Sequence, residues 1–429
     1  MCKKLKLPQF FLVLLTFGTV LACTGLPAPK SSTVQSPIPS QGLQNTSCTL
    51  KPTGTDEFVD KNRERTPDTE TAPDLLGEDF VVEQCPQQIN NRSLSKYEGG
   101  IVYPPFQDPH MYNLQTDRGV AFPPGNIAKG WVGWQFIGSS LDRNWFYYKG
   151  PQTLTQARSR AWVVGGDGKE VARFDTPSLV ISTYWVNSET ILFVTPGPKV
   201  TLLNPLTMKW GDLQLGFTDL YNLEPPASWS FEVDPALKKV IYPPNSTTGH
   251  FRYVLFDIST NEVIWEKNDD FAPFAAPKWS PQGQQFIVID HTNATHNELV
   301  LVDENGQETQ LTNYKAQYPI SFIYNYNWSP DGTKIAYWLD LRSRLDEVSS
   351  KKYLTVFDLE KRKSTLYCVT TLYDHGEAPV WSPDSHELIL RVRDKDDQGK
   401  NLMIDLVENV FAELPIETFW PPIDWLKAK

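Results

Sequence analysis

The chain has 429 residues, which is more than one small domain needs, and its net charge is −11. The acidic excess argues against a nucleic-acid-binding surface, which needs clustered Lys and Arg. All 14 tryptophans lie between Trp131 and Trp425, and no tyrosine precedes Tyr97. This distribution separates an N-terminal part with few core-forming residues from a region that can bury a large core.

Residues 1–22 have the features of an export signal. Three lysines precede the apolar run Phe10–Leu21, which is too short to span a bilayer. The run ends in Val20-Leu21-Ala22-Cys23, which resembles a bacterial lipobox. The resemblance implies that Cys23 is lipidated, becomes the first residue of the mature protein and holds the chain in the bacterial cell envelope, facing the periplasm or the exterior. An ordinary secretory signal with a chance cysteine is the alternative.

Residues 23–95 are rich in Pro, Ser, Thr, Gln and acidic residues. Such a segment buries too little apolar area to offset its ordering entropy, so we expect a lipid-anchored and mostly disordered linker. Phe80-Val81-Val82 is the part that could dock as a short strand. An oxidising compartment permits a disulfide between Cys48 and Cys85. Cys368 lies in an apolar strand and is expected to be a buried free thiol.

A five-residue motif recurs in the rest of the chain. It reads Trp-Ser-Pro-Gln-Gly from Trp279, Trp-Ser-Pro-Asp-Gly from Trp328 and Trp-Ser-Pro-Asp-Ser from Trp381. Decayed copies begin at Trp185 and Trp229, and the steps from Trp185 onward are 44, 50, 49 and 53 residues. Ser, Pro and Gly at these positions favour a type I turn, and a large ring can fill the gap between adjacent sheets. The expected structural residues are Trp279, Trp328, Asp331, Gly332, Trp381 and Asp384.

Each repeat continues with an apolar strand and then a third strand that ends in aspartate. These aspartates are Asp257, Asp303, Asp358 and Asp405. Their recurrence argues for capping of the following turn rather than for catalysis. Four strands in a period of about 50 residues are typical of a propeller blade. The Trp-Ser-Pro-Asp-Gly motif resembles the repeats of TolB-like and WD40-like bacterial propellers. The resemblance implies an all-β fold, and it implies no single function because this scaffold has many roles.

The propeller is expected to span residues 96–429 and to have seven four-stranded blades, with six as the alternative. The last inner strand, around Trp425, meets the C-terminus and needs three outer strands from elsewhere. Residues 96–128 offer them, beginning with the strand near Ile101. We therefore predict that Trp425 pairs beside Ile101 and that strands from both termini close the ring.

Long aromatic loops are expected on one face of this propeller. Loops on a rigid scaffold often carry binding, so this face could hold a protein, peptide or glycan partner. Packing of these residues as extra core over the blades is the alternative. The candidate ligand-face residues are Phe271, Phe274, Tyr314, Tyr318, Phe322, Tyr324, Tyr373 and His375.

One acidic loop resembles a calcium-binding loop. Asp394, Asp396 and Gln398 follow its spacing, and Asp405 stands at the twelfth position. Gln398 replaces an acidic residue, Asp405 replaces the usual Glu, and the flanks are strands. A charged hairpin tip is therefore the alternative, and no other cofactor is expected.

No catalytic motif for a nucleophile elbow, a zinc helix, a redox Cys pair or a phosphate loop is present. The sequence thus favours a non-enzymatic binding or scaffold lipoprotein over an envelope-polymer hydrolase or lyase that uses carboxylates in the central funnel. A ligand-sensing propeller is a third reading. A buried carboxylate pair with raised pKa values in the funnel would favour the enzyme.

Overall fold

The structure is a computed structural model. It describes residues 81–89, 91–103, 110–121, 135–150, 158–166, 169–195, 199–215, 231–243, 251–269, 276–293, 295–342, 351–372, 378–393, 399–415, 422 and 424–427. The export signal, Cys23, Cys48 and most of the expected linker lie outside these residues. Among the described residues, no helix is long and apolar enough to cross a membrane.

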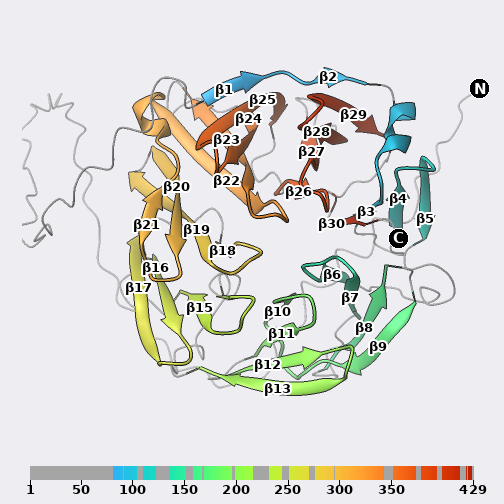
Figure 1. Ribbon diagram of the computed structural model, residues 1–429, viewed down its shortest axis with the longest axis vertical. Helices are drawn as coiled ribbons and strands as arrows, with labels where there is room; N and C mark the ends of the chain where they lie inside the picture. The colour runs from blue at the N-terminus through green and yellow to red at the C-terminus, as the bar shows by residue number, and fades with distance from the viewer. Residues whose placement is uncertain are drawn as a thin grey trace, which may run out of the picture. The chain divides into compact units, whose positions relative to one another are not determined.

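The described strands form antiparallel sets of four that follow one another around a ring (Figure 1). The first three sets in chain order are formed by β6 to β17, and each consists of four consecutive strands. Blade 2 contains β6 (Gln135–Ser139), β7 (Trp145–Lys149), β8 (Arg160–Gly165) and β9 (Glu170–Asp175). Blade 3 contains β10 (Ser182–Trp185), β11 (Ile191–Val194), β12 (Lys199–Asn204) and β13 (Lys209–Gln214). Blade 4 contains β14 (Glu232–Val233), β15 (Lys239–Tyr242), β16 (Phe251–Asp257) and β17 (Glu262–Asp269).

Three more sets follow in chain order. Blade 5 contains β18 (Lys278–Trp279), β19 (Gln285–Asn293), β20 (His296–Asp303) and β21 (Glu308–Gln310). Blade 6 contains β22 (Ile320–Trp328), β23 (Lys334–Arg342), β24 (Lys352–Asp358) and β25 (Lys363–Thr371). Blade 7 contains β26 (Val380–Trp381), β27 (Glu387–Arg393), β28 (Gly399–Asp405) and β29 (Val410–Leu414). A single parallel pair, His296 with Ser321, joins blades 5 and 6 into one sheet.

Strands from both ends of the propeller form blade 1. β30 (Asp424–Leu426) pairs with β3 (Gly100–Tyr103), and Trp425 lies opposite Ile101. β4 (His110–Asn113) and β5 (Arg118–Ala121) complete the sheet. The predicted closure is therefore confirmed. The described residues supply seven sets of four, and the number of blades in the whole chain stays a prediction.

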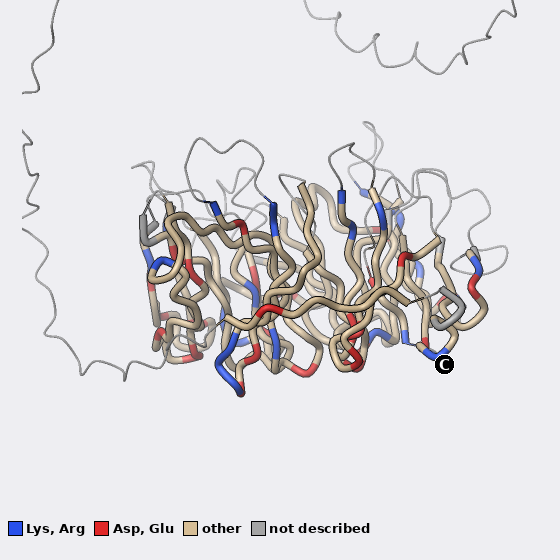
Figure 2. Tube along the Cα trace, turned by 90° about the horizontal axis from the view of Figure 1, so that it is seen from above, with Lys and Arg blue, Asp and Glu red and all other residues tan. Residues whose placement is uncertain are grey.

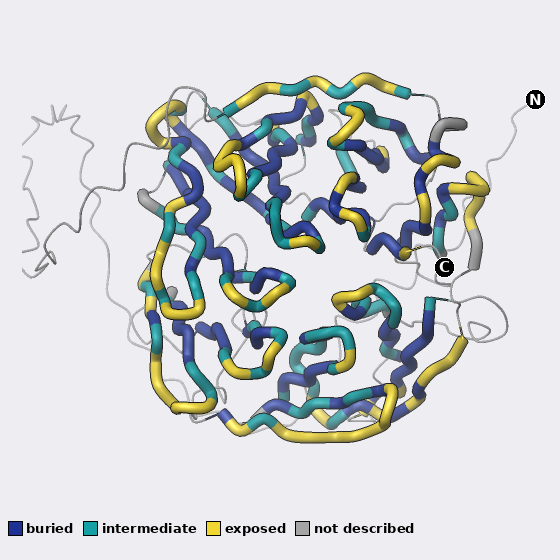
Figure 3. Tube along the Cα trace, viewed as in Figure 1, coloured by how far each residue is buried: buried dark blue, intermediate teal, exposed yellow. Residues whose placement is uncertain are grey.

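The core lies between neighbouring blades and not on one side of a single sheet. Ile287, Ile335 and Tyr337 of blades 5 and 6 share one buried cluster, and the opposite face of blade 6 shares another with blade 7. Successive side chains of a strand point to opposite faces of the sheet. Both faces of blade 6 are buried because a neighbouring blade packs against each of them. Exposed residues gather on the outer strands and turn tips, such as β13 and β17 (Figure 3). Acidic and basic residues occur on both sides of the ring (Figure 2), so the described residues form no face of a single sign.

The inner-strand tryptophans connect successive blades through their indole N–H groups. Trp328 Nε1 donates to the Lys278 carbonyl of the preceding blade at 3.0 Å, and Trp381 Nε1 donates to the Asn327 carbonyl at 3.2 Å. Trp279 does the same to Glu232. Each ring thus fills the gap between two blades and also satisfies its polar atom, as a buried indole requires.

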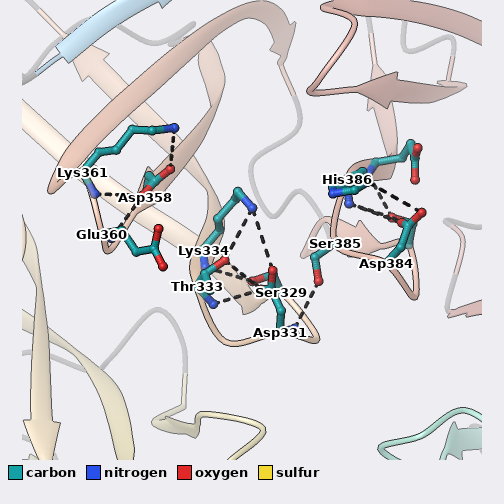
Figure 4. Close-up of polar contacts among 12 residues, drawn as sticks. Ser329, Asp331, Thr333, Lys334, Asp358, Glu360, Lys361, Asp384, Ser385 and His386 are labelled. Carbon is teal, nitrogen blue, oxygen red and sulfur yellow. Dashed lines mark hydrogen bonds and ion pairs between the residues drawn. The ribbon is translucent and has the colours of Figure 1, made fainter.

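The serine and the aspartate of the turn after the inner strand hydrogen-bond to each other in blades 2, 6 and 7, as Figure 4 shows for Ser329 and Asp331. Ser329 Oγ donates to Asp331 Oδ1 at 2.5 Å and accepts the Lys334 N–H at 2.9 Å. Gly332 adopts a φ of 72°, which favours glycine. The turns also contact one another, because the Asp331 N–H donates to Ser385 Oγ of the next blade at 3.1 Å.

The aspartates at the ends of the third strands cap the turns that follow. Asp257 Oδ1 accepts the Ser259 N–H at 2.8 Å, and Asp303 Oδ1 accepts the Asn305 N–H at 2.8 Å. Asp405 Oδ1 accepts the Val407 N–H at 2.9 Å. These aspartates are therefore structural.

The segment before blade 1, residues 81–96, lies along the outer edges of blades 6 and 7 and is called the strap here (Figure 1). β1 (Val81–Gln84) pairs in parallel with β25, and β2 (Gln87–Gln88) pairs in parallel with β29. A 3-10 helix, Asn91–Lys96, follows. The docked strand expected at Phe80–Val82 is therefore present at Val81–Gln84, and the folded unit begins before residue 96.

The cysteine pairing corrects the sequence-based expectation. Cys85 is joined to Cys368, with a Cα–Cα distance of 4.7 Å, and both residues are exposed. Cys368 is thus not a buried free thiol, because β1 docks against β25 and brings Cys85 next to it. Cys85 cannot at the same time pair with Cys48.

Replacing Cys368 with serine should release the strap from blade 6. A disulfide between such distant residues contributes about 2–4 kcal/mol, mainly by restricting the unfolded chain. We expect thermal unfolding at a lower temperature and earlier proteolysis within the strap. Non-reducing peptide mapping of the parent chain should recover Cys85 linked to Cys368, whereas a peptide that links Cys48 to Cys85 would contradict this pairing. Cys48→Ser is the matched control and should change neither result.

Candidate functional site

One register position of the inner strands faces the centre of the ring. It is the residue directly before the Trp position, and its carbonyl receives the indole N–H of the next blade in blades 2, 4, 5 and 6. Strand alternation puts this side chain on the sheet face opposite the Trp, and the inner strands of blades 1 to 6 bring five of these residues together around one cavity. We call this the axial position. Polar residues occupy it in five blades, namely Asp424, Tyr184, Glu232, Lys278 and Asn327.

The register of blade 4 corrects the repeat reading at Trp229. The inner strand is Glu232–Val233, and the Asp234 N–H donates to the Lys239 carbonyl as Ser280 does to Gln285 in blade 5. Val233 therefore holds the Trp position of this blade. Trp229 lies outside the described residues.

The five axial residues line one cavity of about 260 Å³, together with Arg143 and three inner-strand tryptophans. The cavity is bordered by Ser140, Ser280 and Pro330 of the tight turns. It thus lies toward the face of the tight turns. The aromatic loops were expected on the opposite face.

Glu232 and Lys278 are opposite charges on adjacent inner strands. Burial raises the pKa of Glu232 to about 7, and the nearby Lys278 acts against this rise. Burial lowers the pKa of Lys278, and Glu232 opposes that shift. Lys278 Nζ donates to the Tyr326 carbonyl at 3.0 Å. Among the described residues, no hydrogen bond or ion pair reaches the Glu232 carboxylate. A desolvated carboxylate beside a desolvated ammonium is typical of a functional site.

Arg143 closes the other side of the cavity. Its Nη1 donates to the Trp381 carbonyl at 2.7 Å and to the Trp425 carbonyl at 2.8 Å, and it lies 3.9 Å from Asp424 Oδ1. Ser140 Oγ donates to Asp142 Oδ1 at 2.6 Å, as Ser329 does to Asp331. Arg143 therefore stands where this turn has Gly283 in blade 5 and Gly332 in blade 6, and its φ of 56° is unusual for a residue with a side chain.

The raised pKa of Glu232 gives a specific pH dependence. Its folded pKa, about 7, lies above the ordinary value of 4.5, so the folded state holds more protons between these pH values. The stability that this proton contributes is present below pH 4.5 and is lost as the pH rises through about 7. Because Glu232→Gln carries no charge, the variant should gain stability relative to the parent over this window, on the order of 3 kcal/mol at full ionisation.

Urea unfolding of both proteins at several pH values measures the difference. Glu387 also has a pKa raised to about 7 by burial, and it remains in both proteins. Exposed Glu360→Gln is the control and should show no such window. Parallel stability curves for the parent and Glu232→Gln would contradict a desolvated Glu232.

The expected ligand face is only partly described, and two of its described residues are buried. Tyr314 is fully buried, and its hydroxyl donates to Ser364 Oγ at 2.8 Å, so it belongs to the core and cannot contact a ligand. Tyr324 is also buried, between blades 6 and 7. Tyr318 and Phe322 are half-buried and pack against the same cores. These four described residues thus pack against the cores of the blades, and the ligand face stays a prediction. Phe271, Phe274, Tyr373 and His375 lie outside the described residues.

The calcium-loop hypothesis is wrong for Asp405. Asp394, Asp396 and Gln398 lie outside the described residues, and Asp405 ends β28, which begins at Gly399. Six strand steps separate the two ends by about 20 Å. Asp405 caps the turn after β28 and accepts a hydrogen bond from the Tyr97 hydroxyl at 2.8 Å. Within the described ranges, no group of three His, Cys, Asp or Glu side chains could hold a metal ion.

The axial residues were not selected from the sequence, although a signal was present. Tyr184, Lys278, Asn327 and Asp424 each directly precede a Trp of the repeat series. The residue before the structural Trp is polar in these repeats and differs in charge from one repeat to the next, which is a pattern typical of a site that lines the centre of the ring. Glu232 had no such signal, because Val233 replaces the Trp.

No protein-family model matches the sequence. No curated protein is similar to it in sequence at a significant level.

Solved structures are similar in fold. TolB from Acinetobacter baumannii is 16% identical, with 77% of this chain and 82% of that chain covered and a TM-score of 0.39. An oligogalacturonate lyase from Vibrio parahaemolyticus is 10% identical, with 74% and 86% covered and a TM-score of 0.46. The β-propeller domain of Cps50 (Swd1) from Myceliophteria thermophila is 11% identical, with 76% and 97% covered and a TM-score of 0.42. These similarities concern the fold alone. The expected β-propeller fold is confirmed by the successive four-stranded sets, and the likeness to TolB-like and WD40-like propellers extends to the fold alone.

Proposed function

We propose that the chain is a binding module of the bacterial cell envelope, anchored through Cys23, whose propeller receives an envelope protein, peptide or glycan in the axial cavity. The observation that carries the proposal is the pair of desolvated charges, Glu232 and Lys278, on adjacent inner strands. Buried charges without a full set of partners are costly to the fold. A ligand that supplies the missing partners offsets this cost.

Capture from envelope extract tests the proposal. The full chain should retain a partner that the double variant Glu232→Gln/Lys278→Met does not retain. The double variant Glu360→Gln/Lys363→Met changes the same residue types on the surface and should behave like the parent. Failure to recover any partner, together with turnover of a library of envelope polymers, would contradict a binding role.

The anchor is tested separately. Cys23→Ser should move the protein from the membrane fraction to the soluble fraction after cell disruption, because the lipid attached to Cys23 is the proposed membrane anchor. Cys48→Ser is the control. Unchanged fractionation of Cys23→Ser would contradict lipidation at this residue.

A second function, as a hydrolase or lyase that acts on an envelope polymer, is favoured by one observation. A carboxyl group with a pKa of about 7 is matched to general acid–base work near neutral pH. Asp424 lines the same cavity, but it lies beside Arg143 and is not paired with Glu232. If the chain is such an enzyme, Glu232→Gln abolishes turnover of a polymer that the parent degrades.

A further inference from the structure

The axial cavity offers hydrogen-bonding capacity that the fold does not use. Lys278 Nζ has three N–H donors, and the described residues pair one of them, with the Tyr326 carbonyl. The Tyr184 hydroxyl accepts the Val233 N–H at 3.0 Å, and no described residue accepts its own O–H. Within the described part of the chain, the Glu232 carboxylate has no hydrogen-bond donor. The cavity therefore presents an acceptor, Glu232, and a cationic donor, Lys278, to whatever enters it.

The arrangement of these charges restricts the ligand. Each charge is near enough to shift the pKa of the other, yet no ion pair joins them. A simple cation would pair with Glu232 and be repelled by Lys278, and a simple anion would meet the reverse problem. A neutral polyol could bond to both but would leave both charges without a counter-charge. A ligand with both signs satisfies both residues.

The volume of the cavity restricts the ligand further. About 260 Å³ is below the range typical of pockets for drug-sized molecules. It corresponds to roughly eight or nine waters at about 30 Å³ each. This space suits a small molecule, or the end group of a larger one. Trp185, Trp279 and Trp328 line the cavity and give it apolar surface beside its charges.

Given the binding role proposed above, on which this step rests, we infer that the axial cavity binds an α-amino-acid group, with an ammonium and a carboxylate on one carbon. The ammonium donates to the Glu232 carboxylate, and the carboxylate accepts from Lys278 Nζ and the Tyr184 hydroxyl. The group can be a free amino acid or the unblocked end of an amino acid side chain that carries both charges.

Titration of the full chain with small probes tests this inference, and tryptophan fluorescence reports binding because three tryptophans line the cavity. The probes are glycine and alanine, N-acetylalanine, which keeps only the carboxylate, alaninamide, which keeps only the amine, and glucose as a neutral polyol. The free amino acids should bind, and each blocked form should bind at least about tenfold more weakly, since a charge-assisted hydrogen bond contributes about 1.5–3 kcal/mol.

Variants assign the binding to the cavity. Glu232→Gln and Lys278→Met should each weaken amino-acid binding by about 10–100-fold. Glu360→Gln and Lys363→Met should leave it unchanged, and circular dichroism establishes that all four fold. Equal binding of blocked and free forms, no binding of any probe, or binding that the two cavity variants do not weaken would each overturn the inference. Glucose binding that Glu232→Gln weakens would also overturn it. Capture of a macromolecular partner from envelope extract is a separate readout, so the binding role can stand where this ligand class fails.

Discussion

Replacing Trp425 with alanine is expected to lower the free energy of unfolding by about 3–5 kcal/mol, as large-to-small changes at buried tryptophans do. The side chain is 1% exposed and packs against Ile101 and Tyr103, and its Nε1 donates to the Glu98 carbonyl at 3.1 Å. β30 is the only described strand that joins blade 1 to the C-terminal part of the chain. The substitution therefore weakens the ring where it closes.

Urea unfolding monitored by circular dichroism measures this loss. Trp210→Ala is the matched control, because Trp210 is 45% exposed on the outer strand of blade 3, and about 1 kcal/mol is expected there. Gly99→Ala provides an independent change at the closure, since its Cβ would lie 2.1 Å from the Leu426 carbonyl oxygen and its φ is 107°. A Trp425 variant no less stable than the Trp210 variant would contradict closure by β30.

Arg143→Gly is expected to lower the free energy of unfolding by about 2–4 kcal/mol. Glycine suits the positive φ of this turn and recovers about 1 kcal/mol of backbone strain. The lost guanidinium leaves the Trp381 and Trp425 carbonyls without their donor and Asp424 without its cation, and removing one partner of a buried charged pair costs about 3–5 kcal/mol. The loss should exceed the gain.

The glycine variant separates the side chain from the backbone. Arg143→Ala should be less stable than Arg143→Gly, because alanine keeps the strain and also lacks the guanidinium. Arg173→Ala removes an exposed arginine that pairs with Glu170, and it should cost less than about 1 kcal/mol. Thermal unfolding of the four proteins gives the order. An Arg143→Gly variant as stable as the parent would show that the link between blades 7, 1 and 2 contributes nothing.

Most of the fold could be predicted from the sequence because its signals are local and repeated. The Ser-Pro-Asp-Gly turn determines its own geometry through Ser329 and Asp331, and the aspartates at the ends of the third strands of blades 4 to 7 cap their own turns. Closure at Ile101 and Trp425 followed from the number of strands left without partners. These inferences need no knowledge of which residues meet across the ring.

The sequence-based predictions that the structure contradicts concern contacts between distant segments of the chain. Cys85 meets Cys368 only because the strap docks on blade 6, and no periodicity of the sequence encodes that docking. The sequence predicts Tyr314 in a loop, but its hydroxyl contacts those of Tyr337 and Ser364 in the core. The turn Ser140–Arg143 has Arg143 in place of the glycine of the motif, so its sequence does not resemble the other copies.

The candidate site was missed for a related reason. Its residues share a register position and not a motif, so they differ in type from blade to blade. Glu232 and Lys278 are about one repeat apart in sequence and become neighbours only when the ring forms. The repeat can be recognised in a single sequence. Which charged residue lines the cavity follows only from the strand register of each inner strand, which the structure supplies.

The central claim is that Glu232 is a desolvated ligand-binding carboxylate in the axial cavity. Its titration, followed by the side-chain carboxyl ¹³C resonance and assigned with Glu232→Gln, tests this claim most directly. We expect a midpoint near pH 7 for the full chain alone, and a lower midpoint when saturating alanine places an ammonium beside the carboxylate. A midpoint near the ordinary value of 4.5 without ligand would contradict a desolvated Glu232.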